Sequence, residues 1–434
     1  MNFTKYTNEL LGESYFKGIH ESGLEVVVIP KNQMTAYALF ATRYGSMDNT
    51  FKTDKDGDYI TVPDGIAHFL EHKLFENDDG TDTFSRFAGL GASANAYTSN
   101  EMTAYLFSAT ENYYESLEVL LDFVTHPYFT EKTVEKEMGI IEQELRMYED
   151  NPYRWMYQAL QKALYVKNPV RIPVGGTVES IHDITAEILY DCYNTFYNLN
   201  NMVLILCGDL TCNKVAEVMD KTLSKSRDSF IEKKAAREPR RVNEEQVEKC
   251  FPVSRPMFSI GLKETDFNGD GDLYIKREFE HSIISEILFG KSSDFYTKLY
   301  SDGLINQKFG TGYYASKSFA HFIASGESDD PREVFRLMKE EINLFRKGEK
   351  NIDEADFERA KKVLYAASVQ AWNSTSDIAE TFLDYYFAGA DMLRLPEVLS
   401  SITLDDVKAR LEKSYDTTLM SMAVAMPERT KNAE

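Results

Sequence analysis

The sequence predicts an α+β protein built from two related domains in tandem, each a sheet backed by helices. The first observation is length, because 434 residues exceed what one hydrophobic core usually serves. The second is that strand-like and helix-like patterns alternate along the whole chain. The third is an internal repeat whose offset is about half the chain. We expect a first domain at residues 1–225 and a second at residues 226–434.

The repeat is clearest where a helix leads into a strand. Residues 183–209 align without a gap with residues 401–427, at an offset of 218 (401 − 183). Upstream, residues 131–141 resemble residues 354–364 at an offset of 223 (354 − 131). Two generic helix–strand units are the alternative explanation. Between the halves, residues 225–248 are charged and poor in aromatic residues, which predicts a linker.

The first half alternates strands and helices in a readable order. The segments "GLEVVVIP" (23–30) and "TAYALFATRYGS" (35–46) are rich in β-branched and aromatic residues and end at Pro or Gly, as strands do. Residues 64–77 have helical periodicity. Residues 91–110 predict a strand pair that turns at "TSNE". A long helical stretch follows over residues 112–150.

Composition narrows the class of protein. A formal net charge of −22 disfavours nucleic acid as a partner and favours basic ligands. The first residues lack a basic leader with an apolar stretch, and no run reaches the roughly 18 apolar residues of a membrane helix. We therefore expect a cytoplasmic protein without membrane insertion. The cysteines lack CxxC spacing and are expected to be reduced packing residues: Cys192, Cys207, Cys212 and Cys250.

The stretch "GIAHFLEHKLFEN" (65–77) carries the chemistry. His68 and His72 are four residues apart and so share one helix face, where both imidazoles could bind one zinc ion. Glu71 lies near the same face and is placed to work beside the ion. This is the inverted H-x-x-E-H motif of zinc proteases. The alternative is an ordinary amphipathic helix that carries two surface histidines.

A catalytic zinc usually takes three protein ligands and keeps one position for water. The acidic helix "EMGIIEQEL" offers Glu137 and Glu144, seven residues apart on one face, while Glu142 points at a different angle toward solvent. The remaining histidines lack supporting context: His20, His126, His182, His281 and His321.

At these motifs the sequence resembles the inverzincin peptidases, the family of pitrilysin, insulin-degrading enzyme and mitochondrial processing peptidase. The resemblance rests on "GIAHFLEHKLF", "GASANAYTSNEMTAY" and "VEKEMGIIEQELRM", and is closest to the half-length bacterial members that are often encoded in pairs. It implies one zinc ion per chain bound by His68, His72 and Glu144. Glu71 would be the general base that deprotonates a zinc-activated water, and Glu137 would orient a ligand histidine. The two domains would face each other around a chamber.

The same resemblance implies a function and a substrate site. The function is a zinc-dependent endopeptidase acting on short or unstructured peptides, the alternative being a non-catalytic scaffold or peptide-binding subunit. In the family an extended peptide adds as a strand to a sheet edge, here at Ala94, Asn95 and Ala96. A β-hairpin with a buried polar Asn95 is the alternative explanation of this segment.

The second half departs from the family pattern. Nothing in it resembles H-x-x-E-H. The family usually carries an Arg and a Tyr there, near the zinc, but this chain has Tyr300 and Asn306 at the matching positions. Tyr313 and Tyr314 are close, in a different register. Either the segment is misaligned, or a related subunit in a hetero- or homodimer supplies the Arg and Tyr.

Overall fold

The computed structural model describes residues 1–53, 57–225, 230–266 and 269–428. Contacts between Cα atoms divide the chain into two compact units. The first unit comprises residues 1–145, 172–235 and 369–387, and the second comprises residues 146–171, 236–368 and 388–434. The unit boundaries therefore differ from a single cut between residues 225 and 226.

The first unit contains a seven-stranded sheet in the order β1-β2-β3-β9-β4-β8-β7. Strand β3 runs parallel to β9, whereas β4 is antiparallel to both β9 and β8. Strand β7 forms one edge and pairs with β8 alone in this sheet, with Thr98 opposite Thr103. The strands are β1 (Phe3–Asn8), β2 (Glu13–Ile19), β3 (Glu25–Pro30), β4 (Ala36–Thr42), β7 (Ser93–Thr98), β8 (Thr103–Ala109) and β9 (Met202–Gly208).

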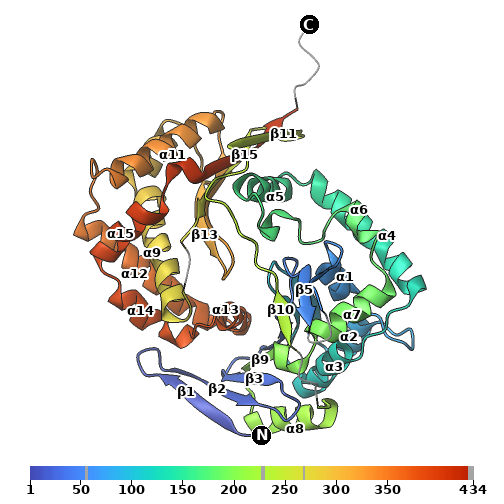
Figure 1. The fold of residues 1–434 in the computed structure, drawn as a ribbon. Helices are drawn as coiled ribbons and strands as arrows, with labels where there is room; N and C mark the ends of the chain where they lie inside the picture. Colours follow the sequence, from blue (N-terminus) through green and yellow to red (C-terminus); the bar gives the residue numbers. More distant parts are fainter. Residues whose placement is uncertain (54–56, 226–229, 267–268, 429–434) are drawn as a thin grey trace. The chain divides into compact units, whose positions relative to one another are not determined.

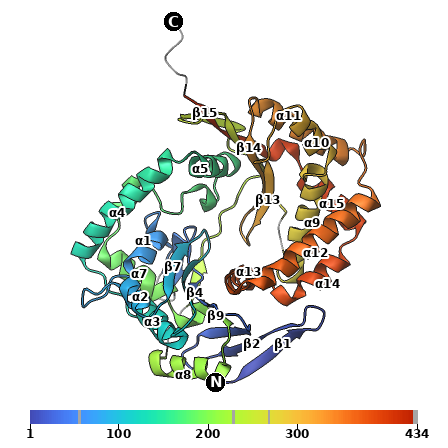
Figure 2. The ribbon, with the colours of Figure 1, turned by 180° about the vertical axis from the view of Figure 1, so that it is seen from behind.

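Helices cover this sheet because their apolar faces match its buried side chains. The helices assigned wholly or mainly to this unit are α1 (Ile66–Lys73), α2 (Thr83–Gly89), α3 (Tyr113–Thr125), α4 (Glu131–Asp150), α6 (Val178–Ile181), α7 (Ala186–Phe196), α8 (Cys212–Thr222) and α13 (Thr375–Phe387). Figure 2 shows α1, α2 and α3 beside the β7 end of the sheet. Helix α13 packs on β4 and β9.

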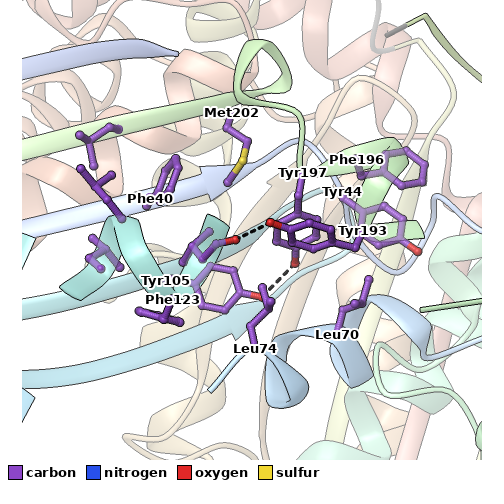
Figure 3. Close-up of a cluster of buried hydrophobic side chains, with 14 of the residues drawn as sticks. Phe40, Tyr44, Leu70, Leu74, Tyr105, Phe123, Tyr193, Phe196, Tyr197 and Met202 are labelled. Carbon is purple, nitrogen blue, oxygen red and sulfur yellow. Dashed lines mark hydrogen bonds between the residues drawn. The ribbon is translucent and has the colours of Figure 1, made fainter. Parts of the chain in front are cut away.

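Aromatic residues fill the core beneath helix α1. Figure 3 shows Tyr105 and Tyr197 with their hydroxyl groups joined at 2.9 Å, so that each buried phenol has a polar partner. Leu70 and Leu74, on the same stretch of chain as the H-x-x-E-H motif, are buried in this cluster. Core packing therefore fixes how α1 presents its other face.

The second unit repeats this plan with a five-stranded sheet in the order β11-β15-β12-β14-β13. Its pairing matches that of β3-β9-β4-β8-β7, including one parallel neighbour. Helices α9 and α15 pack together there, and α14 lies against α9 (Figure 1). The strands are β11 (Gln246–Phe251), β12 (Met257–Glu264), β13 (Gly310–Ala315), β14 (Ala320–Glu327) and β15 (Met420–Pro427). The helices are α5 (Pro152–Leu164), α9 (Asp272–Phe289), α10 (Asp294–Ser301), α11 (Pro331–Arg346), α12 (Glu354–Gln370), α14 (Leu395–Ser401) and α15 (Leu404–Ser414).

The internal repeat is confirmed at the predicted offset. Helices α7 and α15 each begin after a threonine whose side chain caps the helix, Thr185 and Thr403, which are 218 residues apart (403 − 185). Strands β9 and β15, which follow them, occupy the same position in the two sheet orders. The α+β prediction of two related domains is therefore correct.

Each half of the sequence contributes one helix to the unit that is built mainly from the other half. Helix α5, from the first half, packs on β15, β12 and β11. Helix α13, from the second half, packs on β4 and β9. An amphipathic helix pattern shows which face is buried but not which sheet covers it, so the sequence did not predict this exchange.

The predicted linker is partly wrong. Residues 226–229 lie outside the described residues, but the rest of the 225–248 stretch includes regular structure. Strand β10 (Ile231–Lys233) pairs with β5 (Thr50–Thr53), which pairs with β6 (Ile60–Thr61) to form a three-stranded sheet, and β11 begins at Gln246. Charged residues on edge strands resemble a linker in composition, because only one side of such a strand is paired.

A buried ionic network lies in the second unit. The carboxylate of Glu264, at the end of β12, accepts hydrogen bonds from Ser414 at 2.8 Å and from Tyr313, and lies 3.2 Å from Arg410. His281 Nε2 lies 3.1 Å from the same carboxylate. Although burial acts in the opposite direction, these hydrogen-bond donors lower the pKa of Glu264 to about 2.

The sequence predicted reduced cysteines and no membrane-spanning helix. All four cysteines are free thiols, and Cys192 and Cys207 are fully buried. In the part of the chain that the structure describes, no helix has the length and apolar character needed to cross a membrane.

Candidate metal centre

Helix α1 begins at a close approach between two glycine-containing segments. Gly65 precedes the helix with φ of 91°, a left-handed conformation that favours glycine. A Cβ atom on Gly65 would lie 2.3 Å from the carbonyl oxygen of Gly175. A Cβ atom on Gly175 would in turn lie 3.4 Å from Nδ1 of His68. The segment around Gly175 therefore packs directly against the start of the helix and its first histidine.

Three predicted ligands converge. Nε2 of His72 lies 3.4 Å from Oε2 of Glu144, and Nε2 of His68 lies 3.9 Å from the same oxygen. Candidate ligand atoms of all three residues lie within 4.8 Å of one another. Ligands at about 2.0–2.1 Å from a tetrahedral zinc are themselves about 3.3 Å apart. Two imidazoles and one carboxylate at this spacing fit a zinc ion with one open position. No other group of at least three metal-binding side chains was found among the described residues.

Glu137 contacts the ring nitrogen of His72 that faces away from Glu144. Its Oε1 lies 3.0 Å from Nδ1 of His72, which leaves Nε2 to face Glu144. Although burial opposes both shifts, this contact lowers the pKa of Glu137 and, together with the charges of Glu71 and Glu144, raises the pKa of His72. A carboxylate on the second ring nitrogen orients a metal-binding histidine and strengthens it as a ligand. Glu137 thus contacts one candidate ligand, and its role in orienting that histidine stays a prediction.

Glu71 lies on the same helix and is 9% exposed. Its Oε2 accepts a 2.6 Å hydrogen bond from the hydroxyl of Thr98, the last residue of β7. Burial raises the pKa of Glu71, and the Thr98 bond and the charge of His72 offset this effect only in part. A raised carboxyl pKa suits proton transfer near neutral pH. Nothing in the sequence indicated that Thr98 contacts Glu71.

A cavity of about 520 Å³ opens beside these residues. Its lining includes Glu71, His72 and Glu137, together with Asn95 and Ala96 of β7. The stacked rings of Phe75 and Phe84 also line it. The cavity therefore borders one predicted ligand, His72, and two of the three predicted substrate residues.

The three predicted substrate residues alternate along β7. Ala94 and Ala96 are half-buried and pack against the core, while Asn95 is exposed. Oδ1 of Asn95 accepts a 2.9 Å hydrogen bond from the N–H of Ala96. Since Asn95 is exposed, the alternative of a buried polar residue is wrong. The role of the three residues in binding substrate stays a prediction.

The other acidic and histidine candidates lie elsewhere. Glu142 is half-buried rather than fully exposed, and its carboxylate lies 3.6 Å from His182. His20 is buried between Ser22 and Asp220. His281 and His321 are buried in the second unit, and His126 is on the surface.

Two family models match consecutive parts of the chain. Residues 61–178 match insulinase (peptidase family M16), and residues 183–364 match the peptidase M16 inactive domain. YmfH of Bacillus subtilis, described as an uncharacterized zinc protease, is 38% identical over 425 residues, which cover 96% of this chain and 98% of YmfH. The chain belongs to peptidase family M16.

Two further relatives of this M16 chain extend the comparison. A crystal structure of an M16-like peptidase from Alicyclobacillus acidocaldarius has a TM-score of 0.91 and 34% identity, covering 99% of both chains. The mitochondrial-processing peptidase subunit beta of Caenorhabditis elegans is 30% identical over 164 residues, or 36% of this chain and 35% of that protein. The resemblance to the inverzincin peptidases is confirmed. M16 membership and the zinc-protease relatives support a metallopeptidase with zinc as its metal.

The second half of this M16 chain does not present the family's Arg and Tyr at the matching positions. Tyr300 is 44% exposed at the end of α10, and Asn306 donates a hydrogen bond to Glu327. Tyr313 is engaged with Glu264 in the buried network, whereas Tyr314 is 49% exposed. The hydroxyl of Tyr313 is thus occupied by Glu264, and neither residue at the matching positions carries a guanidinium.

Proposed function

We propose that this chain is a zinc-dependent endopeptidase that hydrolyses short or unstructured peptides, with Glu71 as the general base. The observation that carries the proposal is the convergence of His68, His72 and Glu144 beside the buried carboxylate of Glu71. When bound, zinc supplies a Lewis acid that makes water more acidic and stabilises negative charge on the peptide carbonyl oxygen.

Residues of the chain transfer the proton, orient a zinc ligand and bind the peptide. Glu71 accepts a proton from the attacking water and delivers it to the amine nitrogen as the C–N bond breaks. Glu137 holds His72 so that Nε2 faces the metal position. Strand β7 offers an open edge to which an extended peptide can add by backbone hydrogen bonds. A folded protein presents no such free strand, so short or unstructured peptides are the favoured substrates.

The decisive experiment is digestion of a mixed peptide library with mass-spectrometric detection. Purified wild-type chain is compared with and without zinc, beside Glu71→Gln and the control Glu142→Gln, whose carboxylate lies by His182. We expect zinc-dependent cleavage by the wild type and the control, and a rate at least 10²-fold lower for Glu71→Gln with zinc still bound. Cleavage by Glu71→Gln at the wild-type rate would refute the assigned role.

We further propose that a related subunit supplies the missing Arg and Tyr. The support is that Tyr300 and Asn306 stand where the family carries these residues, and that one relative is named as a subunit. The test compares the peptidase rate of the purified chain alone with that of the chain co-expressed with a related protein encoded beside it. Equal rates would show that the chain needs no partner.

A further inference from the structure

We infer that the hydroxyl group of Thr98 positions the Glu71 carboxylate and thereby ties the general base to the strand that receives the peptide. The inference rests on the proposed function and adds a positioning residue to it. Thr98 is the last residue of β7, the edge strand, and its Oγ1 lies 2.6 Å from Oε2 of Glu71. Such a short contact to a carboxylate is typical of a charge-assisted hydrogen bond.

A count of protons assigns the direction of this bond. The Thr98 hydroxyl has two neighbours, the Glu71 carboxylate at 2.6 Å and the Thr103 hydroxyl at 3.3 Å. The single proton of Thr103 is already given to the carbonyl oxygen of Tyr44 at 2.9 Å. An ionised carboxylate can only accept, so the Thr98 proton goes to Glu71. Once Glu71 has taken a proton, it can donate to the Thr98 oxygen, and the contact survives the transfer.

The position of Thr98 is itself fixed from both faces of the sheet. Successive side chains of a strand point to opposite faces, so Tyr97 points away from Glu71. The Tyr97 hydroxyl donates a 2.6 Å hydrogen bond to Glu380 of α13, and Tyr37 of β4 donates one to the same carboxylate at 2.7 Å. The end of β7 is therefore anchored to α13 on one face and to α1 on the other.

In this arrangement the same strand, β7, sets the position of the peptide and the position of the general base. A peptide that pairs with β7 takes its position from the backbone of that strand. The carboxylate of Glu71 is held by the last residue of the same strand, mainly through the hydroxyl of Thr98 and also through its backbone N–H. A misplacement of about 1 Å can cost about 10²-fold in rate, so a hydroxyl that fixes the base should affect turnover much more than peptide binding.

The test uses three variants and a fluorogenic peptide that the wild type cleaves. Thr98→Val keeps the shape and removes the hydroxyl, and Thr98→Ser keeps the hydroxyl. Thr103→Val removes the neighbouring hydroxyl, whose proton goes to Tyr44 and not to Glu71. We expect Thr98→Val to lower kcat 10- to 100-fold, with KM within about twofold and one zinc per chain. Thr98→Ser should recover most of kcat, and Thr103→Val should stay within about threefold of the wild type.

A crystal structure of the zinc-free protein gives a readout that does not depend on activity. The wild type should show Glu71 bonded to Thr98, and Thr98→Val should show the carboxylate in another rotamer. The inference is overturned if Thr98→Val keeps full kcat, if Thr103→Val loses as much, or if wild-type Glu71 points away from Thr98. Failure of the proposed function looks different, because the zinc-loaded wild type would then cleave no peptide while the crystal structures still decide the position of Glu71.

Discussion

Nδ1 of His72 lies 3.0 Å from Oε1 of Glu137, so the ring nitrogen that faces away from the metal position is held by a carboxylate. This contact fixes the tautomer in which Nδ1 carries the proton and Nε2 keeps its lone pair for the metal. We therefore expect the position of this imidazole, and its strength as a zinc ligand, to depend on Glu137.

The first prediction removes this support. Glu137→Gln should lower zinc affinity about 10- to 100-fold, because the amide orients His72 less well and no longer increases its basicity. Glu135→Gln is the matched control, since that side chain is exposed on the same helix and should leave affinity unchanged. Competition with a zinc-binding dye measures both. Equal affinities for the two variants would contradict the role of Glu137.

The second prediction concerns pH. Despite burial, the hydrogen bond to Glu137 and the charges of Glu71 and Glu144 raise the pKa of His72 above its ordinary value of 6.5. Zinc must displace the proton on Nε2, so zinc affinity should fall when the pH is lowered through the pKa of His72. The fall should start at a pH above 6.5 and reach up to tenfold per pH unit below that pKa. Glu137→Gln should move this fall to lower pH. Zinc titrations of the wild type and Glu137→Gln from pH 5.5 to 8.5 measure this shift. Identical pH profiles for the two proteins would contradict the prediction.

The third prediction concerns the start of α1. Gly65→Ala should destabilise the protein by about 1–3 kcal/mol, because φ of 91° is strained for alanine and the new methyl would meet the carbonyl oxygen of Gly175. Zinc affinity should fall as well, since His68 lies on the first turn. Gly139→Ala, inside α4 with no atom within 4 Å of the added Cβ, should instead stabilise by up to about 1 kcal/mol. Chemical unfolding separates the two, and equal effects would refute this account.

The fourth prediction concerns the second unit. The pKa of Glu264 is about 2 in the folded protein and 4.5 as its ordinary value, so its ionised form stabilises the fold. This contribution, on the order of 3 kcal/mol, is present above pH 4.5 and is lost as the pH falls through about 2. Glu264→Gln should therefore have a lower free energy of unfolding than the wild type at pH 7. This difference should shrink to less than half by pH 3.

Urea unfolding at the two pH values tests the fourth prediction. Glu333→Gln is the control, because Glu333 pairs with Arg336 three residues away at the surface of α11 and such pairs contribute little. We expect that control to change stability by less than about 1 kcal/mol at both pH values. A Glu264→Gln gap that is constant with pH would show that the carboxylate acts through packing rather than charge.

Local periodicity predicted much of the fold and the proximity of two of the candidate ligands. His68 and His72 share a helix face because of their spacing alone, and the 218-residue offset located α15 and β15. The choice of Glu144 over Glu137 as a ligand needed the family resemblance, since both lie on the same face of α4. Thr98 escaped prediction because it reaches Glu71 from a strand 27 residues away, and a single threonine on a strand carries no distinctive signal. The strands at residues 231–233 and 246–251 were missed because their exposed charges resemble a linker.

The exchange of α5 and α13 has a consequence for how the protein is made. While the ribosome is still synthesising the second half, the seven-stranded sheet lacks α13, so the face of β4 and β9 is without this helix until residue 387 has emerged. The core of the first unit is thus completed only after the second half has been translated. A transcript cut between the halves would yield two fragments, each with one helix that packs on the sheet of the other, and we expect the two to fold best when mixed.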